Sequence, residues 1–174
     1  MTSRLPLLKG SYHDQIITAQ GQALDLGWHS NIIVDRCRYL LAAFMKGDRA
    51  MGIRLLAVGK GIKSWDIQPP SPPLKTRQRL IDPNPFKIVI KRSQIKYLDP
   101  TGNPTNSPTN RIQIIVTIKP GVPPIEGEGD TYPLREFGLF GRFMNKDYMI
   151  DYIRHPVIHK QADDKLVRTI RLIF

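Results

Sequence analysis

The sequence predicts a mainly β (α+β) domain: an antiparallel β-sheet or sandwich-like fold with one short buried helix and an extended N-terminal arm. Three observations support this class. Apolar and polar residues alternate along the chain, most clearly from Arg111 to Lys119. Residues 36–46 instead show the spacing of an amphipathic helix. Segments rich in proline and glycine separate these stretches, as turns and loops do.

Length and composition predict one domain. A chain of 174 residues with 41% hydrophobic residues can bury a core without disulfides or metals. We expect an N-terminal arm over residues 1–30 and a single β-rich structural domain over residues 31–174. The sequence shows neither a signal peptide nor an apolar run long enough for a transmembrane span, so we expect a cytoplasmic protein or one within an assembled particle.

The first 30 residues contain Gly10, Gly21 and Gly27 and one short apolar patch at Ile16 and Ile17. We expect this arm to become ordered only against a neighbouring subunit, because ordering a flexible segment costs backbone entropy. Ile16, Ile17 and Trp28 are the expected contact residues.

A helix is predicted from Arg36 to Lys46, with Asp35 as its N-cap and Gly47 as its left-handed C-cap. Its apolar stripe is spaced at i, i+3, i+4 and i+7 and consists of Cys37, Leu40, Leu41 and Phe44. Cys37, the single cysteine, is therefore expected to be a core thiol. No base or oxyanion site suggests that it is a nucleophile.

The next segments are predicted from their apolar runs and their breakers. Residues 53–58 form a strand that ends in a turn at Gly59 and Gly61, which is too short for a phosphate-binding loop. Residues 66–85 contain six prolines and are expected to cross the core as an extended connector. Residues 86–98 and 111–119 are predicted strands joined by a polar hairpin loop, and residues 148–160 and 166–174 are two further strands, the last held within a sheet.

The central stretch of the chain runs from Tyr132 to Phe143. In an extended conformation Leu134, Glu136, Gly138 and Phe140 share one face, whereas Arg135, Phe137, Leu139 and Gly141 share the other. Gly138 marks either a close approach by another segment or a glycine tolerated in a core strand. Glu136 is expected to be buried and paired with an arginine, for which Arg154 is the favoured candidate.

Two groups of residues have the chemistry of metal ligands but not the required spacing. His155 and His159 are four residues apart, but Pro156 disfavours the helix that would bring them onto one face. Glu126, Glu128 and Asp130 lack the glycine-centred spacing of a calcium loop. We therefore predict no metal, no cofactor, no small-molecule substrate and no catalytic residues, and hence a protein that is not an enzyme.

Several motifs, in this order, resemble the N-terminal module of phage tail-collar fibre proteins and related subunits of phage-tail-like contractile injection particles. The first motif is Asn31–Asp35, which leads into the helix that ends at Gly47, and the second is Leu55–Gly61. The third is Leu134–Phe140, which contains a Glu-x-Gly-Leu-Phe pattern. The fourth is Ile153-Arg154 followed by Pro156–Lys160. The resemblance covers residues 31–174. It implies assembly roles for Gly59, Gly61, Glu136, Gly138, Leu139, Phe140 and Arg154.

The resemblance implies a structural subunit of a phage-tail-like contractile injection particle that contacts other subunits in multiple symmetric copies. Such fibres continue into a repetitive shaft, and this chain ends at Phe174, so we expect a baseplate or collar component that attaches a tail fibre. The net charge of +11 leaves an alternative open: a basic adaptor that binds nucleic acid or an anionic membrane surface. No single strand carries the aromatic and basic residues of a stacking platform.

Overall fold

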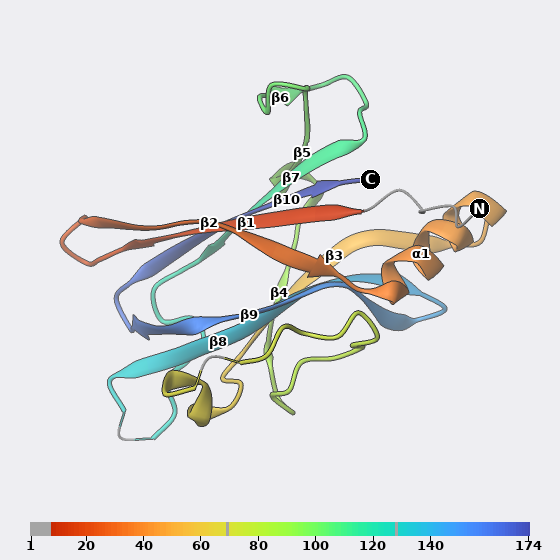
Figure 1. Ribbon diagram of the computed structural model, residues 1–174. Helices are drawn as coiled ribbons and strands as arrows, with labels where there is room; N and C mark the ends of the chain where they lie inside the picture. Colours follow the sequence, from red (N-terminus) through yellow and green to blue (C-terminus); the bar gives the residue numbers. More distant parts are fainter. Residues whose placement is uncertain (1–7, 69, 128) are drawn as a thin grey trace.

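The structure is a computed structural model that describes residues 8–68, 70–127 and 129–174. Its strands form a ten-stranded antiparallel sheet in the order β4-β3-β8-β9-β2-β1-β10-β7-β5-β6, which confirms the mainly β class (Figure 1). The elements are β1 (Lys9–Ile17), β2 (Ala23–Ile33), α1 (Asp35–Lys46), β3 (Ala50–Gly59), the 3₁₀ turn η1 (Lys63–Asp66), β4 (Phe86–Val89), the 3₁₀ turn η2 (Arg92–Gln94), β5 (Ile95–Leu98), β6 (Pro104–Thr105), β7 (Arg111–Ile118), β8 (Thr131–Phe143), β9 (Lys146–Gln161) and β10 (Lys165–Ile173).

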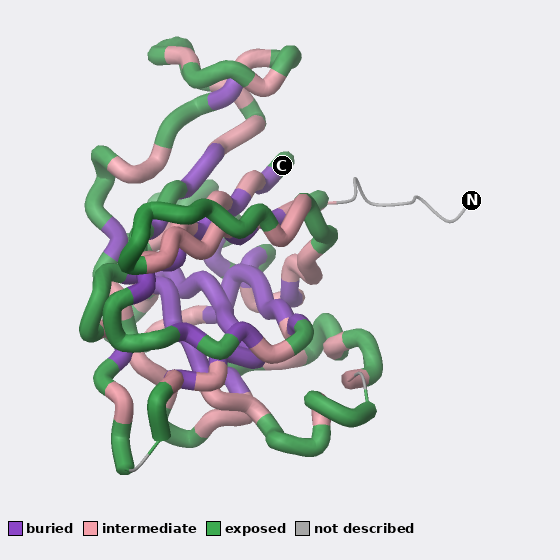
Figure 2. The backbone as a smooth tube through the Cα atoms, turned by 90° about the vertical axis from the view of Figure 1, so that its left-hand side faces the viewer, coloured by how far each residue is buried: buried purple, intermediate pink, exposed green. Residues whose placement is uncertain are grey.

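The sheet curls over on itself, so that β1, β10 and β7 face β3, β8 and β9 (Figure 1). β2 connects the two layers: it pairs with β1 and, through Ile32 and Ile33, with β9. The buried residues gather between the layers (Figure 2). Leu56, Ile114 and Phe137 belong to this main core, which excludes water from apolar side chains of both layers.

The helix forms as predicted, although its start and its buried face differ from the prediction. Val34 is the N-cap, and Asp35 lies in the first turn, where a carboxylate interacts favourably with the positive end of the helix dipole. Gly47 has φ 83° and ends the helix, so the predicted left-handed cap is confirmed. Cys37 and Leu40 are buried, but Leu41 and Phe44 are exposed, so the predicted stripe is only half covered.

The predicted single strand over residues 86–98 is wrong. Ile90 donates its backbone N–H to Arg54 O, after which η2 redirects the chain. β4 therefore pairs with β3, while β5 pairs with β7 at the other end of the strand order. The strands predicted over 111–119, 148–160 and 166–174 are confirmed as β7, β9 and β10, and β10 lies between β1 and β7.

The prediction of a separate N-terminal arm is also wrong for residues 8–30, which are the part of the arm that the structure describes. β1 and β2 form a hairpin inside the sheet, and β1 pairs with β10 along its whole length. The side chains that β1 buries are Tyr12 and Asp14. Because Asp14 is charged, this segment lacks the alternation of apolar and polar residues by which a half-buried strand is recognised in a sequence.

Candidate functional site

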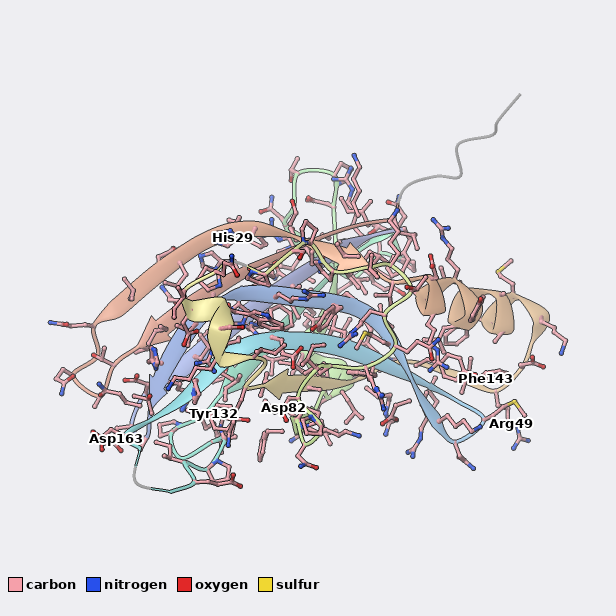
Figure 3. All side chains as sticks on the ribbon, turned by 60° about the horizontal axis from the view of Figure 1, so that its bottom comes forward. His29, Arg49, Asp82, Tyr132, Phe143 and Asp163 are labelled. Carbon is pink, nitrogen blue, oxygen red and sulfur yellow. The ribbon has the colours of Figure 1, made fainter. Side chains whose placement is uncertain are left out.

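Glu136 anchors the proline-rich connector to β8. Its side chain is fully buried, with 0% exposure, as predicted. The carboxylate accepts hydrogen bonds from the backbone N–H groups of Ile81 at 2.9 Å and Asp82 at 2.6 Å, and from the hydroxyl of Tyr152. Asp82 lies alongside β8, nearer to Tyr132 than to Phe143 (Figure 3). The acid therefore holds the connector against the sheet.

The prediction that Glu136 pairs with Arg154 is wrong, because these two side chains form no ion pair in the described part of the chain. Arg154 lies opposite Glu136 in the β8–β9 register. However, its guanidinium donates to Ser71 O at 3.1 Å and stacks over the Trp65 ring, 5.3 Å from the centroid. Backbone N–H groups of the connector already satisfy the carboxylate. Both side chains nevertheless hold the same connector.

Three glycines provide the space that this arrangement needs. A Cβ at Gly138 would lie 3.0 Å from Asp151 O and 3.3 Å from Leu80, so of the two interpretations of this glycine the close approach of another segment holds. A Cβ at Gly59 would lie 2.9 Å from atoms of Asp82 and Glu136. Gly61 has φ 55° and lies against the Trp65 ring. Such short contacts exclude larger residues without movement of the backbone.

Leu139 and Phe140 are neighbours in sequence that belong to different clusters. Leu139 lies in the main core, whereas Phe140 packs with Leu80 and Tyr152 beneath the connector. The predicted alternation along β8 is interrupted because its register with β9 shifts between Leu134 and Glu136 and again after Leu139. Leu134 consequently lies in the main core, not on the face of Glu136.

The residues expected to contact a neighbour through an arm lie in the β1–β2 hairpin. Ile16 packs against the main core, and Ile17 pairs with Ala23 across the hairpin. Trp28 is 48% exposed on β2. Of the three, Trp28 offers the largest free surface.

A buried charged network holds β1 to β10, and no sequence pattern indicates it. Arg168 is fully buried and donates from Nε and Nη2 to the two carboxylate oxygens of Asp14, both at 2.6 Å. Its guanidinium lies 3.5 Å from the centroid of the Phe137 ring. Asp14 and Arg168 are 154 positions apart, and neither belongs to a recognisable motif. Only the pairing of β1 with β10 brings them together.

His155 completes this network as a neutral imidazole. Its Nδ1 donates to Pro156 O at 2.7 Å, because a carbonyl oxygen can only accept, and its Nε2 faces Arg168 Nη2 at 3.4 Å. Burial, followed by the charge of Arg168, lowers the pKa of His155 to about 4. His159 instead lies beside Thr131. Within residues 8–68, 70–127 and 129–174, no three His, Cys, Asp or Glu side chains are grouped as a metal site requires.

Asp151 is a further buried acid, and it lies in the seam between β2 and β9. Its carboxylate accepts from Leu139 N at 2.8 Å and from Asn31 Nδ2 at 2.7 Å. Burial raises the pKa of Asp151 to about 7, despite these two hydrogen bonds. Asp151 itself belongs to one of the two residue pairs through which β2 and β9 are joined, opposite Ile33.

An apolar groove of about 200 Å³ opens beside α1. Its walls come from α1, β3, β5, β7 and β9 and from the C-terminal residue; they are Cys37, Leu40, Leu41, Phe44, Gly52, Ile53, Ile95, Ile112, Ile150 and Phe174. Phe44 is 47% exposed at its edge. Burial raises the pKa of the Cys37 thiol to about 11, which keeps it protonated at neutral pH and agrees with a core thiol.

α1, which forms one wall of the groove, is basic: it contains three basic residues and one acidic residue. Arg54, Lys96 and Arg111 each adjoin a lining isoleucine in β3, β5 or β7, and because successive strand residues point to opposite faces, these charges do not line the groove. The groove is therefore an apolar surface beside a basic helix, and it can accept a large apolar side chain from an acidic partner.

Comparisons with known proteins identify no relative: no family model, no curated protein and no solved structure matches the chain. α1 has 12 residues, and no helix of the described chain has the length and the apolar character needed to cross a bilayer.

Proposed function

We propose that this chain is a structural subunit of a phage-tail-like contractile injection particle, where it serves as a baseplate or collar attachment component. The observation that carries the proposal is the apolar groove beside α1, with Leu41 and Phe44 exposed at its edge. A helix that leaves part of its apolar stripe uncovered is expected to bury it against another protein. The groove suggests an assembly role, and the motifs that resemble tail-collar proteins suggest that the assembly is a phage-tail-like particle.

The buried polar groups support an architectural role. Glu136 and Arg154 bind the backbone of the connector, and Asp14 and Arg168 bind each other. In each case the hydrogen bonds hold one segment of the chain against another. Such bonds give a rigid body on which an interface can be preorganised.

The partner at the groove is a different subunit with an acidic surface and at least one large apolar side chain. A second copy of this chain would bring the same positive charge against the basic helix α1 and would be repelled. The net charge of +11 on the chain as a whole adds to this repulsion. The particle would contain several symmetric copies of this chain, and each copy would bind one partner subunit through its groove.

Phe44→Glu tests the proposal, with Tyr39→Glu as its matched control. Both residues are exposed aromatics on α1, but Tyr39 does not line the groove. Tagged proteins would be produced in the host that carries the gene, and particles would be sedimented and imaged by electron microscopy. We expect the native chain and Tyr39→Glu in the particle fraction and Phe44→Glu outside it.

Two results would contradict different parts of the proposal. Absence of the native chain from sheath-bearing particles would remove the assignment to a contractile particle. Equal incorporation of Phe44→Glu and Tyr39→Glu would show that the groove is not the assembly surface. Melting temperatures of both variants within a few degrees of the native chain would establish that neither result reflects unfolding.

A further inference from the structure

A second surface lies on the outer face of β1, β10 and β7. A cleft of about 350 Å³ separates these strands from the β5–β6 hairpin, which rises beside them (Figure 1). Its lining includes the basic side chains of Lys9, Arg111 and Arg171 and no acidic side chain. Ser11 and Gly102 also line it. The cleft therefore concentrates positive charge in a concave site that is distinct from the groove beside α1.

Arg171 is held in place inside this cleft. Its Nε donates to Gln113 Oε1 at 2.9 Å, and its guanidinium lies 4.5 Å from the centroid of the Trp28 ring. Its Nη1 points toward Gly102, where a Cβ would lie 3.5 Å away. Among the described residues neither Nη1 nor Nη2 has a hydrogen-bond partner. These two nitrogens are therefore free to bind the oxygens of an anion.

Trp28 extends the cleft with an aromatic surface. The residue is 48% exposed, and its ring contacts both His13, with 5.2 Å between the ring centroids, and the Arg171 guanidinium. His13 is itself fixed by Asp25, 2.8 Å from its Nε2. Trp28 on β2 and Arg171 on β10 meet across β1, the strand between them. Trp28 and Arg171 come from different strands, so the tertiary structure and not a local sequence pattern brings this aromatic ring and this guanidinium together.

We propose that this cleft binds single-stranded nucleic acid without sequence preference. Lys9, Arg111 and Arg171 would contact the phosphates, and a base would stack against the part of the Trp28 ring that His13 and Arg171 leave exposed. A concave site with a fixed aromatic ring beside a free guanidinium fits a phosphate and its base better than it fits a flat lipid surface. The acids nearby do not oppose this role: Asp25 binds His13, and Asp99 accepts from Thr101 and Asn103 within its own turn. This activity does not depend on the assembly role.

The main test compares two double variants of the full chain. Lys9→Gln with Arg171→Gln removes two charges from the cleft, and Lys63→Gln with Lys119→Gln removes two exposed charges that do not line it. Binding of a fluorescent oligothymidylate would be measured by anisotropy across a range of salt concentrations. We expect the cleft variant to lose at least about tenfold more affinity than the control. Its salt dependence should be less steep by about 1.4 in the log–log slope.

Trp28→Leu tests the stacking separately. It should weaken oligothymidylate binding at least about fivefold while leaving the binding of inorganic polyphosphate unchanged, because polyphosphate has no base to stack. Lys9→Glu, at an exposed strand end, provides a second charge variant if the double variant does not fold.

Three outcomes would overturn the proposal. Equal losses in the cleft and control variants would show that diffuse charge alone binds the oligonucleotide. Equal weakening of oligonucleotide and polyphosphate by Trp28→Leu would remove the stacking contact. Binding to phosphatidylserine vesicles with no binding to the oligonucleotide would identify a membrane surface as the ligand.

Discussion

At the scale of single residues, Glu136 illustrates how a buried charge is stabilised without a counter-ion. Two backbone N–H groups and one hydroxyl surround its carboxylate. Hydrogen bonds to a charged acceptor are stronger than those between neutral groups, and three of them offset much of the cost of removing the charge from water.

Glu136→Ala should lower the free energy of unfolding by at least about 3 kcal/mol, because it leaves the Ile81 and Asp82 amides and the Tyr152 hydroxyl without their acceptor. Glu126→Ala removes an exposed acid and should change stability by less than about 0.5 kcal/mol. Urea unfolding of both variants measures the difference. Equal effects would show that the carboxylate does not anchor the connector.

Asp151 makes stability depend on pH. Its pKa is about 7 in the folded protein and 3.8 when unperturbed, so the unfolded chain releases this proton at a lower pH than the folded one. Stability contributed by this group therefore falls as pH rises from about 4 to about 7 and stays constant above that range. A pKa difference of about 3 corresponds to a penalty on the order of 4 kcal/mol at high pH.

Asp151→Asn should remove this penalty. The amide oxygen can still accept from Leu139 N. Asn31 now presents its Nδ2 to Asp151, and once the Asn31 amide turns over, the new N–H₂ can donate to Asn31 Oδ1, which is buried without a partner in the described chain. We expect the variant to be more stable than the native chain at pH 8 by about 1–3 kcal/mol, with the advantage disappearing near pH 4. Urea titrations at several pH values measure this. A stability difference that does not vary with pH would rule out titration of Asp151.

At the scale of elements, the proline-rich connector is an extended segment that obtains its order from β8 and β9. Six prolines limit the backbone hydrogen bonds that it can form with a strand, so side chains of the sheet bind it instead. Glu136 and Arg154 contact it through hydrogen bonds, and Leu80 packs onto Phe140 and Tyr152.

Gly138→Ala should destabilise the protein by about 1–3 kcal/mol, because its Cβ meets Asp151 O at 3.0 Å and Leu80 at 3.3 Å. Gly52→Ala, also in a strand, adds a Cβ with nothing within 4 Å and serves as the control. Differential scanning calorimetry of both variants compares them. A neutral Gly138→Ala would show that the connector can shift away from β8.

At the scale of the whole molecule, the N-terminal hairpin is part of the sheet. β1 lies between β2 and β10, and the Asp14–Arg168 pair lies inside this junction. Without β1, the fully buried Arg168 would lose its carboxylate partner, and β10 would expose one edge.

Deletion of residues 1–28 should therefore abolish the cooperative unfolding transition. Asp14→Ala alone should cost about 3–5 kcal/mol, because it leaves a buried guanidinium uncompensated. Asp25→Ala removes an exposed acid of the same hairpin and provides the control for the point variant. Circular dichroism during thermal unfolding follows all three proteins. A truncated chain with a native-like transition would show that β1 is dispensable.

The sequence by itself determined the elements whose signal is local. Alternation in β7, the helical spacing and Gly47 of α1, and the prolines of the connector are patterns within short segments, where neighbouring residues indicate the same structure. The burial of Glu136 was also predictable, because this residue lies within a run of large apolar side chains that a folded chain buries, whereas the sequence left two interpretations of Gly138 open.

Only the tertiary structure decided which distant groups meet. Asp14 and Arg168 are 154 residues apart, Arg154 binds the connector and not Glu136, and Trp28 meets Arg171 across an intervening strand. The sheet's register sets these contacts, and a shift such as the one between Leu134 and Glu136 moves side chains from one face to the other. The exposure of Leu41 and Phe44 has the same origin: a helical stripe predicts an apolar face, but the surrounding strands determine how much of it they cover.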